Sequence, residues 1–392
     1  MNPKILHTQV QDFIRNNAHA DLYRLLLQPS PFTGIHAREL AEQIESRQKA
    51  AHKLPLWHAT GGIYYPNKRN LEQSSSERTA AYKAALAPAK KVIDLTGGFG
   101  ADTFYFSKYA ETVQYCEADP ELAAIATHNF ARLGADNITT YAGDGMEWLF
   151  QEARTADLIY IDPSRRSKQK KRVFLLSDCH PDITGLLPGL LAAAATLMVK
   201  TSPLLDLTAG LRELDRVKEV HIVAVNNEVK EVLWLLGEGF SGKVEVITVN
   251  LTDAGKEVFS FAFDHEKSAT STYSDPLSYL YEPNAAIMKS GGFQSLGAQY
   301  QLHKLHEHSH LYTSHALVAF PGRRFHIQRV LPFSRKTMQQ LAIEKANVST
   351  RNFPETVAGI RKRFKISDGG PVYLFFTKSI DLGLIVIECK KI

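Results

Sequence analysis

Apolar residues follow two different periods along this chain. From residue 1 to about 70 they recur at the three- and four-residue spacing of amphipathic helices, as in "DLYRLLLQ" and "HARELAEQIESRQKAAHKL". From Lys91 to about Phe263, short apolar strands alternate with helical stretches. Such alternation implies crossover connections, so the sequence predicts a helical N-terminal region followed by a mostly parallel sheet covered by helices.

Several segments have the composition of buried strands. They are "KVIDL" (91–95), "TVQYCEA" (112–118), "ITTYA" (138–142), "ADLIYID" (156–162), "ATLMVKT" (195–201), "KEVHIVAV" (218–225), "KVEVITVN" (243–250) and "EVFSFAF" (257–263). The turn-rich passage "GGIYYPNKRNLEQSSSERTAAYKAAL" is expected to lead into a helix, and Ser74 and Glu77 within it have capping-box spacing. The polar segment "DHEKSATSTYSD" (264–275) is predicted to be a linker, and the tail beyond it has a strand, helix and strand pattern.

The loop after the first predicted strand, within "VIDLTGGFGADTFYFSK", is rich in glycine. In a doubly wound sheet such a turn lets the backbone approach a ligand at the carboxyl ends of the strands. Gly97, Gly98 and Gly100 supply the turn, but the third glycine of a dinucleotide fingerprint is missing, which weakens an NAD interpretation. The loop instead fits class I S-adenosylmethionine methyltransferases, with Thr96 in place of their first glycine. Asp94, which ends the strand, is expected to hold the amino-acid end of that cofactor.

Three further strand ends agree with the same cofactor. Glu117 ends the second strand, where its carboxylate would accept bonds from both ribose hydroxyls. Asp144 and Gly145 follow the third strand, where the carboxylate would take the adenine amino group and the adjacent backbone would contact the ring. "IDPSRR" follows the fourth strand, where methyl acceptors bind. Together the four motifs predict a site for S-adenosyl-L-methionine.

The composition is that of an ordinary folded protein with several domains. The chain has 392 residues, of which 44% are hydrophobic and 22% charged. No apolar run approaches the length of a bilayer span, so a cytoplasmic location without a membrane partner is expected. Cys116, Cys179 and Cys389 are far apart and form no CxxC pair, so the sequence predicts neither a disulfide framework nor a metal site.

Positive charge is concentrated in two places, although the net charge is only +5. The first group directly follows the fourth strand and comprises Arg165, Arg166, Lys168, Lys170, Lys171 and Arg172. The second lies near the C-terminus and comprises Arg351, Arg361, Lys362, Arg363 and Lys365. Two separated basic groups on a nearly balanced chain indicate a polyanion bound at defined places, since phosphate contacts supply most non-specific affinity for nucleic acids. The alternative is that each group is a solvated face.

Several of these stretches together resemble a known family. "LEQSSSERTAAYKAAL", "VIDLTGGFGADTFYF" and "YIDPSRR" resemble the bacterial class I methyltransferases that carry a THUMP-like domain. "NVSTRNFPETVAGIRKRFKI" looks like a segment of that domain, and "YLYEPNAAIMKSGGFQSL" looks like the piece that precedes it. The glycine turn and the acid-proline tip are also similar to those of the rRNA guanine-N2 methyltransferases and the trimethylguanosine synthases.

This resemblance implies an α/β fold with four parts. They are a helical N-terminal domain (1–72), a Rossmann-like class I methyltransferase domain with a mostly parallel seven-stranded sheet (73–268), a small ferredoxin-like or connecting module (269–320) and a small α+β THUMP-like domain (321–392). Because THUMP domains grip RNA away from the catalytic centre, the resemblance implies that the C-terminal basic group is a second contact with ribosomal or transfer RNA.

The acid-proline tip predicts the chemistry of the acceptor site. An exocyclic amine of a base is a poor nucleophile, and Asp162 with the carbonyl of Pro163 would accept its two N–H bonds and aim its lone pair. Amino-methyltransferases usually continue with a proline and an aromatic residue that stacks on the base, whereas this chain has Ser164 and Arg165. Arg165 would then stack on the base or bind phosphate, and Phe99 or Phe104 is a candidate for the missing aromatic face.

Other functions stay open at this point. Asp-Pro-x-Arg is also similar to the uracil-C5 methyltransferases, which need a cysteine nucleophile, and Cys179 is the candidate. The acceptor could instead be a protein, DNA or a small molecule, or the chain could be a non-catalytic RNA-binding protein with a vestigial cofactor pocket. We favour an RNA methyltransferase that acts on guanine N2.

Some remaining residues have two interpretations. Lys200 ends the fifth strand and either neutralises phosphate or caps the sheet. The histidines of "HKLHEHSH" (His303, His306, His310) favour a polar helix face over a zinc site. Structural roles are predicted for Trp57, Trp148, Trp234 and Asn129.

Overall fold

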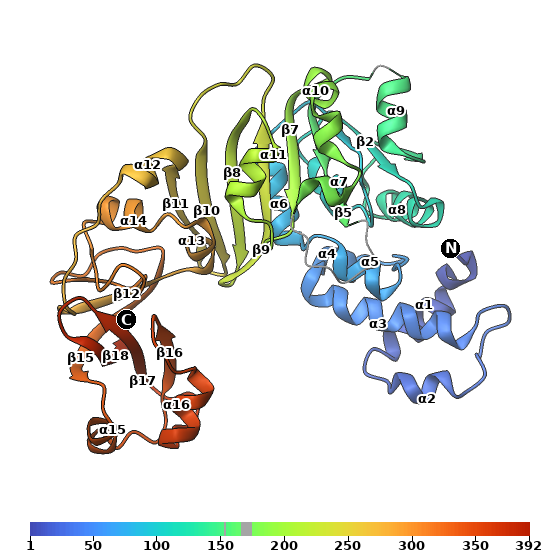
Figure 1. The fold of residues 1–392 in the computed structure, drawn as a ribbon. Helices are drawn as coiled ribbons and strands as arrows, with labels where there is room; N and C mark the ends of the chain where they lie inside the picture. The colour runs from blue at the N-terminus through green and yellow to red at the C-terminus, as the bar shows by residue number, and fades with distance from the viewer. Residues whose placement is uncertain (153, 166–174) are drawn as a thin grey trace. The chain divides into compact units, whose positions relative to one another are not determined.

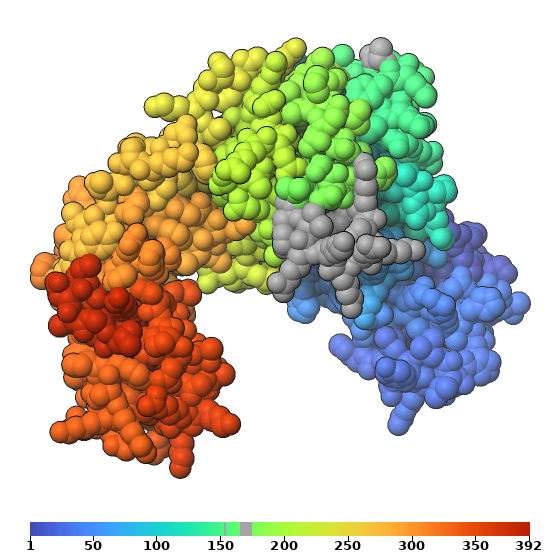
Figure 2. Space-filling view, viewed as in Figure 1, coloured from blue at the N-terminus to red at the C-terminus, as the bar shows by residue number. Residues whose placement is uncertain are grey.

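The computed structural model describes residues 1–152, 154–165 and 175–392, which Figure 2 shows in colour. The chain forms two compact units. Unit 1 comprises Met1–Lys218 and Val232–Ser241, and unit 2 comprises Glu219–Glu231 and Gly242–Ile392. Among the described residues, no helix combines the length and apolar character that crossing a membrane requires.

Unit 1 begins with helices, as predicted from the spacing of its apolar residues (Figure 1). They are η1 (Pro3–Leu6), α1 (Thr8–Asn16), α2 (Leu22–Leu26), α3 (Ala37–Lys53), α4 (Pro55–Ala59) and α5 (Lys68–Gln73). Their apolar sides share one core with the first helices of the following α/β region, and in that core the fully buried Trp57 ring meets Phe104 at 4.7 Å between centroids. The Asn129 side chain joins the same parts, because it accepts a bond from the backbone N–H of Tyr64 and donates one to its carbonyl, both at 2.9 Å. The structural role predicted for Asn129 is confirmed.

The α/β region alternates strands and helices as the sequence predicts. In order they are α6 (Glu77–Leu86), β1 (Lys91–Asp94), α7 (Ala101–Phe106), β2 (Thr112–Glu117), α8 (Pro120–Arg132), β3 (Ile138–Ala142), α9 (Gly145–Gln151), β4 (Ala156–Ile161), α10 (Ile183–Ala193), β7 (Ala194–Thr201) and α11 (Leu207–Glu213). β1 lies between β2 and β4, with β3 beside β2 and β7 beside β4, and all of these pairs are parallel. This arrangement brings the carboxyl ends of β1 to β4 to one edge, where α/β sheets bind their ligands.

The sheet has nine strands, where seven were predicted. Its order is β11-β10-β8-β9-β7-β4-β1-β2-β3, with β8 (Val217–Val225), β9 (Glu228–Leu236), β10 (Glu245–Thr252) and β11 (Gly255–Ala262). The sequence prediction missed β9, which pairs antiparallel with β7. Asn226 and Asn227 connect β8 to β9 with φ values of 48° and 66°, as in a tight hairpin turn that would more commonly hold glycine.

Unit 2 contains a second sheet of seven strands, in the order β13-β14-β12-β15-β18-β17-β16. Its strands are β12 (Tyr279–Pro283), β13 (His303–Lys304), β14 (Tyr312–Ser314), β15 (Gly322–Pro332), β16 (Asn347–Arg351), β17 (Val372–Ser379) and β18 (Gly383–Lys391). The helices of unit 2 are α12 (Phe263–Ser268), α13 (Ala285–Ser290), α14 (Phe293–Tyr300), α15 (Arg335–Leu341) and α16 (Val357–Phe364). Successive residues of β17 enter different cores, since Leu374 and Phe376 belong to one and Phe375 to the other.

Three local predictions were wrong. The first turn of α6 is capped by Ser76, whose Oγ accepts a bond from Thr79 N at 3.3 Å, and Ser74 instead ends α5. The predicted linker begins inside a short helix, α12 (Phe263–Ser268). The predicted histidine helix is the strand β13 followed by turns, and His310 stacks on Phe293 with 3.6 Å between ring centroids. No group of three or more metal-binding side chains occurs in the described part of the chain.

Candidate active site

The glycine loop lies between β1 and α7. A Cβ at Gly97 would come within 2.1 Å of the Tyr115 ring, and one at Gly100, where φ is +86°, would come within 2.5 Å of Phe130. Gly98 has φ +57°, a Cβ there would meet only the Thr96 carbonyl oxygen, at 3.9 Å, and its N–H donates to Glu117 Oε2 at 2.8 Å. The loop therefore packs tightly on its inner side, is tied to the end of β2, and is open where a ligand would approach.

Two acids at neighbouring strand ends keep part of their acceptor capacity. Glu117 accepts one backbone N–H on each oxygen, from Gly98 and, at 2.9 Å, from Asp119, and its side chain is half-buried. Asp144 caps α9, since its Oδ1 accepts from Met146 N at 2.8 Å and from Glu147 N at 3.2 Å. Because a carboxylate offers about four acceptor positions, both side chains can accept further bonds while their backbone contacts hold them in place.

Asp94 has a different environment. It is completely buried, and it accepts bonds from the Thr96 N–H at 3.0 Å and the Thr103 hydroxyl at 2.6 Å. Burial raises the pKa of Asp94 to about 7, although both hydrogen bonds favour the ionised form. In this structure the Asp94 carboxyl bonds the glycine loop at Thr96 and α7 at Thr103, and its expected contact with the ammonium group of the cofactor stays a prediction.

Asp162 lies just beyond the end of β4. Its backbone N–H donates to Thr96 Oγ1 at 2.7 Å, so Thr96 links the glycine loop to the acid-proline tip. The Asp162 side chain is 35% exposed, and its Oδ2 accepts a bond from Lys200 Nζ at 2.5 Å. Pro163, next in the chain, is buried. The acid-proline tip, Asp162 and Pro163, is thus fixed through the Asp162 backbone, while the Asp162 carboxylate is partly exposed to solvent.

A buried network continues behind this pair. Lys83 Nζ lies 3.2 Å from Asp102 Oδ1, and the Ser75 and Tyr160 hydroxyls donate to Asp102 Oδ2 at 2.7 and 2.9 Å. Burial disfavours ionisation of Asp102, but the charges of Lys83 and Lys200 outweigh it and hold the pKa of that carboxyl below its usual range. Sequence reasoning assigned no role to Lys83 and Asp102; a lysine within the apolar run "TAAYKAAL" was the available signal.

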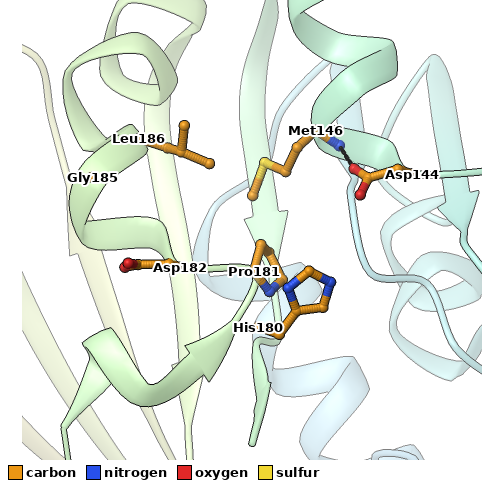
Figure 3. A pocket seen from close by; sticks show the side chains of 7 residues that line it. All are labelled: Asp144, Met146, His180, Pro181, Asp182, Gly185 and Leu186. Atoms are coloured by element: carbon orange, nitrogen blue, oxygen red, sulfur yellow. Dashed lines mark hydrogen bonds between the residues drawn. The ribbon is translucent and has the colours of Figure 1, made fainter. Parts of the chain in front are cut away.

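A pocket of about 390 Å³ opens beside the end of β3 (Figure 3). Asp144 and Met146 line it on the side of α9. On the opposite side it is lined by His180, Pro181 and Asp182, which precede α10, and by Gly185 and Leu186 in the first turn of α10. Figure 3 shows the Met146 side chain extending across the pocket toward Pro181. The sequence predicted Asp144 here, but it did not predict the opposite wall.

The remaining predicted site residues have mixed outcomes. Phe99 and Phe104 are 3% and 1% exposed, so neither presents a face to an incoming base in this structure. Trp57 and Trp234 are core residues as predicted, but Trp148 is only half-buried and lies against Arg154. Arg166, Lys168, Lys170, Lys171 and Arg172 lie outside the described residues, and for Arg165 only the backbone is described, in the short strand β5 (Ser164–Arg165).

In unit 2, acids accompany the predicted basic group. Arg351 bonds to the buried Glu282 at 2.9 Å, Arg361 pairs with Asp368, and Arg363 pairs with Glu355 at 2.6 Å. Lys362 and Lys365 are exposed and have no ion pair with a described residue. Much of the positive charge predicted for this segment is therefore compensated locally.

Three family models match separate parts of the chain. The model for the ribosomal RNA adenine dimethylases matches residues 73–177. A model for a ferredoxin-like domain matches residues 279–321, and a THUMP domain-like model matches residues 322–391. The chain is also similar to the solved structure of a candidate methyltransferase from Porphyromonas gingivalis W83. That match has 33% identity and a TM-score of 0.90, and covers 100% of this chain and 98% of the other. The chain belongs to the S-adenosylmethionine-dependent methyltransferases that carry a THUMP-like domain.

More distant relatives agree with this assignment. An uncharacterized S-adenosylmethionine-dependent methyltransferase of Mycobacterium tuberculosis is 23% identical over 358 residues, which cover 88% of this chain and 94% of the relative. The 23S rRNA (uracil(1939)-C(5))-methyltransferase RlmD of Xanthomonas campestris is 27% identical over 217 residues, 50% of this chain and 45% of that protein. The predicted fold class, enzyme class and cofactor are confirmed.

The residues present fit S-adenosyl-L-methionine. The open side of Gly98 allows a ligand to approach the loop, and Glu117 and Asp144 retain acceptor positions for hydroxyl and amino groups. The pocket beside Asp144 is of a size that suits a small ligand. Its walls include the apolar side chains of Met146, Pro181 and Leu186, which suit a flat aromatic ring.

Proposed function

We propose that this methyltransferase modifies RNA, and that its acceptor is the exocyclic amine of a base, with guanine N2 favoured. The observation that carries the proposal is the Asp162 carboxylate, which is partly exposed while Thr96 holds its backbone and Lys200 its Oδ2. The RNA part is supported by the ribosomal RNA adenine dimethylase match, the THUMP-like match and the name of the Xanthomonas relative.

The bound cofactor supplies a methyl group on a sulfonium, which a nucleophile displaces in line. Glu117 is proposed to hold the ribose hydroxyls, Asp144 the adenine amino group, and the backbone at Gly97, Gly98 and Gly145 to lie against the cofactor. Asp162 and the Pro163 carbonyl would accept the two N–H bonds of the amine and so direct its lone pair, which is the alignment that an in-line displacement requires. The Asp162 carboxylate is also suited to take the proton that the amine must lose.

The experiment is to incubate the protein with labelled S-adenosylmethionine and with transcripts of small- and large-subunit ribosomal RNA. The RNA is then digested to nucleosides and analysed by mass spectrometry. We expect label in N2-methylguanosine. Label in the methylated amine of another base would identify that base, and not guanine, as the acceptor. The absence of label from all RNA would overturn the RNA proposal in favour of a protein, DNA or small-molecule acceptor. A failure to bind cofactor would favour the non-catalytic alternative.

Uracil C5 is a second candidate acceptor. The name of the Xanthomonas relative states that activity, and Cys179 pairs with Arg165, which follows the acid-proline tip in the chain. Cys179 is in β6 (Cys179–His180), directly opposite Arg165 of β5, and is half-buried. A uracil-C5 mechanism needs a cysteine nucleophile, so Cys179→Ala would abolish it, whereas amine methylation would continue. Label in 5-methyluridine that disappears in Cys179→Ala would replace guanine N2 with uracil C5.

A further inference from the structure

Asp162 belongs to a set of four charged side chains that pass from the acceptor tip into the protein interior. Lys200 Nζ lies 2.5 Å from Asp162 Oδ2 and 4.0 Å from Asp102 Oδ2. Lys83 Nζ approaches the other Asp102 oxygen at 3.2 Å. The Ser75 hydroxyl lies between them, since it accepts bonds from Lys83 at 3.1 Å and Lys200 at 3.3 Å and donates to Asp102.

Burial increases steadily along this set. The exposed fraction of the side chain is 35% for Asp162, 12% for Lys200, 10% for Asp102 and 0% for Lys83. The two lysines balance the two aspartates, and an uncompensated charge at such depth would be costly. Lys200 can therefore stay charged beneath the acceptor tip because Asp102 and Asp162 are on either side of it, and Asp102 is held in turn by Lys83.

We propose that Lys200 is a positioning residue, which fixes the Asp162 carboxylate for the methyl acceptor, and that Ser75, Lys83 and Asp102 hold Lys200 in place. This rests on the proposed role of Asp162. The Lys200 bond orients the carboxylate through Oδ2 and the Thr96 bond fixes the backbone, so Oδ1 faces the amine in one orientation. The inference also gives a role to the segment "SSSERTAAYK", which contributes Ser75 and Lys83 from outside the glycine loop.

The first test is a double-mutant cycle of Lys200→Met and Asp162→Asn, measured by turnover on the RNA that the parent protein methylates. Lys200→Met should lower kcat about 100-fold with an unchanged affinity for S-adenosylhomocysteine by calorimetry, because only the alignment of the acceptor is lost. In the Asp162→Asn background the same change should lower kcat no further. Lys200→Arg, which keeps a donor and a positive charge, should recover part of the rate. A full additional loss in that background would overturn the inference.

Neighbouring serines provide a matched control. Ser75→Ala removes the bridge between Lys83, Asp102 and Lys200, and should lower kcat about tenfold. Ser76→Ala removes the bonds of the Ser76 hydroxyl to the N–H and the hydroxyl of Thr79 at the cap of α6, and should lower the melting temperature while turnover stays the same. Equal effects of the two substitutions on turnover would show that this segment acts through stability alone, and would overturn the role given to Ser75.

A second measurement does not depend on the substrate. The same cycle, followed by thermal unfolding of the free protein, should show that the losses from Lys200→Met and Asp162→Asn do not add, because each removes the same ion pair. Additive losses would overturn the inference. If the parent protein methylates no RNA but the stability cycle shows coupling, the proposed RNA function fails and the Lys200 pairing stands.

Discussion

Two regions of this chain carry the charges that the sequence predicts to bind ligands, and the structure treats them differently. At the carboxyl ends of β2, β3 and β4, Glu117, Asp144 and Asp162 are held by backbone N–H groups or by Lys200 and still have acceptor positions open. Near the C-terminus, Arg361 and Arg363 are paired with Asp368 and Glu355. A charged group is available to a ligand when its neighbours orient it without using all of its bonding capacity, and a sequence pattern does not reveal that difference.

The largest effect should come from Asp162. Asp162→Ala should reduce methyl transfer about 100-fold or more, with cofactor affinity and melting temperature near those of the parent, because only the acceptor's alignment is removed. The assay is single-turnover transfer of labelled methyl groups. Asp157→Ala is the control from the same strand, since among the described residues Asp157 accepts backbone bonds from Lys90 and Lys91 alone, and it should leave transfer unchanged. Near-normal transfer by Asp162→Ala would show that Asp162 does not align the methyl acceptor.

Next in size is the loss of a buried charge. Lys83→Met should lower the free energy of unfolding by about 3 to 5 kcal/mol, since it leaves Asp102 short of a partner in the interior. Urea denaturation measures this. Lys90→Met breaks an ion pair that is 80% and 69% exposed, and should change stability little. Similar losses of unfolding free energy in Lys83→Met and Lys90→Met would contradict the prediction, because burial of the ion pair would then have no effect on its contribution to stability.

Cofactor affinity tests the strand-end acids themselves. Glu117→Ala should weaken binding of S-adenosylmethionine by about 1.5 to 3 kcal/mol, because it removes charge-assisted bonds to the ribose. Isothermal calorimetry measures the change. Asp136→Ala, an exposed aspartate in the turn before β3, should have no effect. Unchanged affinity in Glu117→Ala would mean that the ribose is held elsewhere.

The pH dependence of stability tests Asp94, which is buried, unlike the partly exposed acids at the ends of β2 to β4. Its folded-state pKa of about 7 lies above the ordinary value of 3.8, so its contribution to stability is fully present below about pH 4 and is lost as pH rises toward 7. Asp94→Asn should therefore flatten the pH dependence of the unfolding free energy between pH 4 and 7, and should be relatively more stable at pH 8. An unaltered profile would contradict the assignment.

The smallest effect should come from the C-terminal basic group. Lys362→Ala with Lys365→Ala should weaken RNA binding a few-fold and lower the salt dependence by up to about two counterions. Arg361→Ala with Asp368→Ala removes one balanced pair and should change neither quantity. Filter binding at several salt concentrations compares them. Equal effects of the two double variants would mean that the ion pairs open when RNA binds, and unaltered binding in both would favour a solvated face.

The parts of the site that come from one strand and its following turn could be predicted from sequence. Glu117, Asp144 and Asp162 each follow a short apolar strand, and parallel pairing necessarily brings these ends to one edge. Lys83 and Asp102 could not be found in this way, because their partnership depends on how α6 packs beside α7. The His180 and Pro181 wall comes from a segment with no strand or helix pattern, and β9 was missed because two asparagines form its turn.

The shared core of unit 1 limits how the molecule can be divided. Residues 73–177 match a methyltransferase model by themselves, yet Trp57 packs against Phe104, and Asn129 satisfies both backbone groups of Tyr64. A fragment that begins at residue 73 would expose this apolar surface to water and leave Asn129 without its partners. The first seventy residues therefore supply part of the folding free energy of the catalytic region, and a minimal active fragment has to include them.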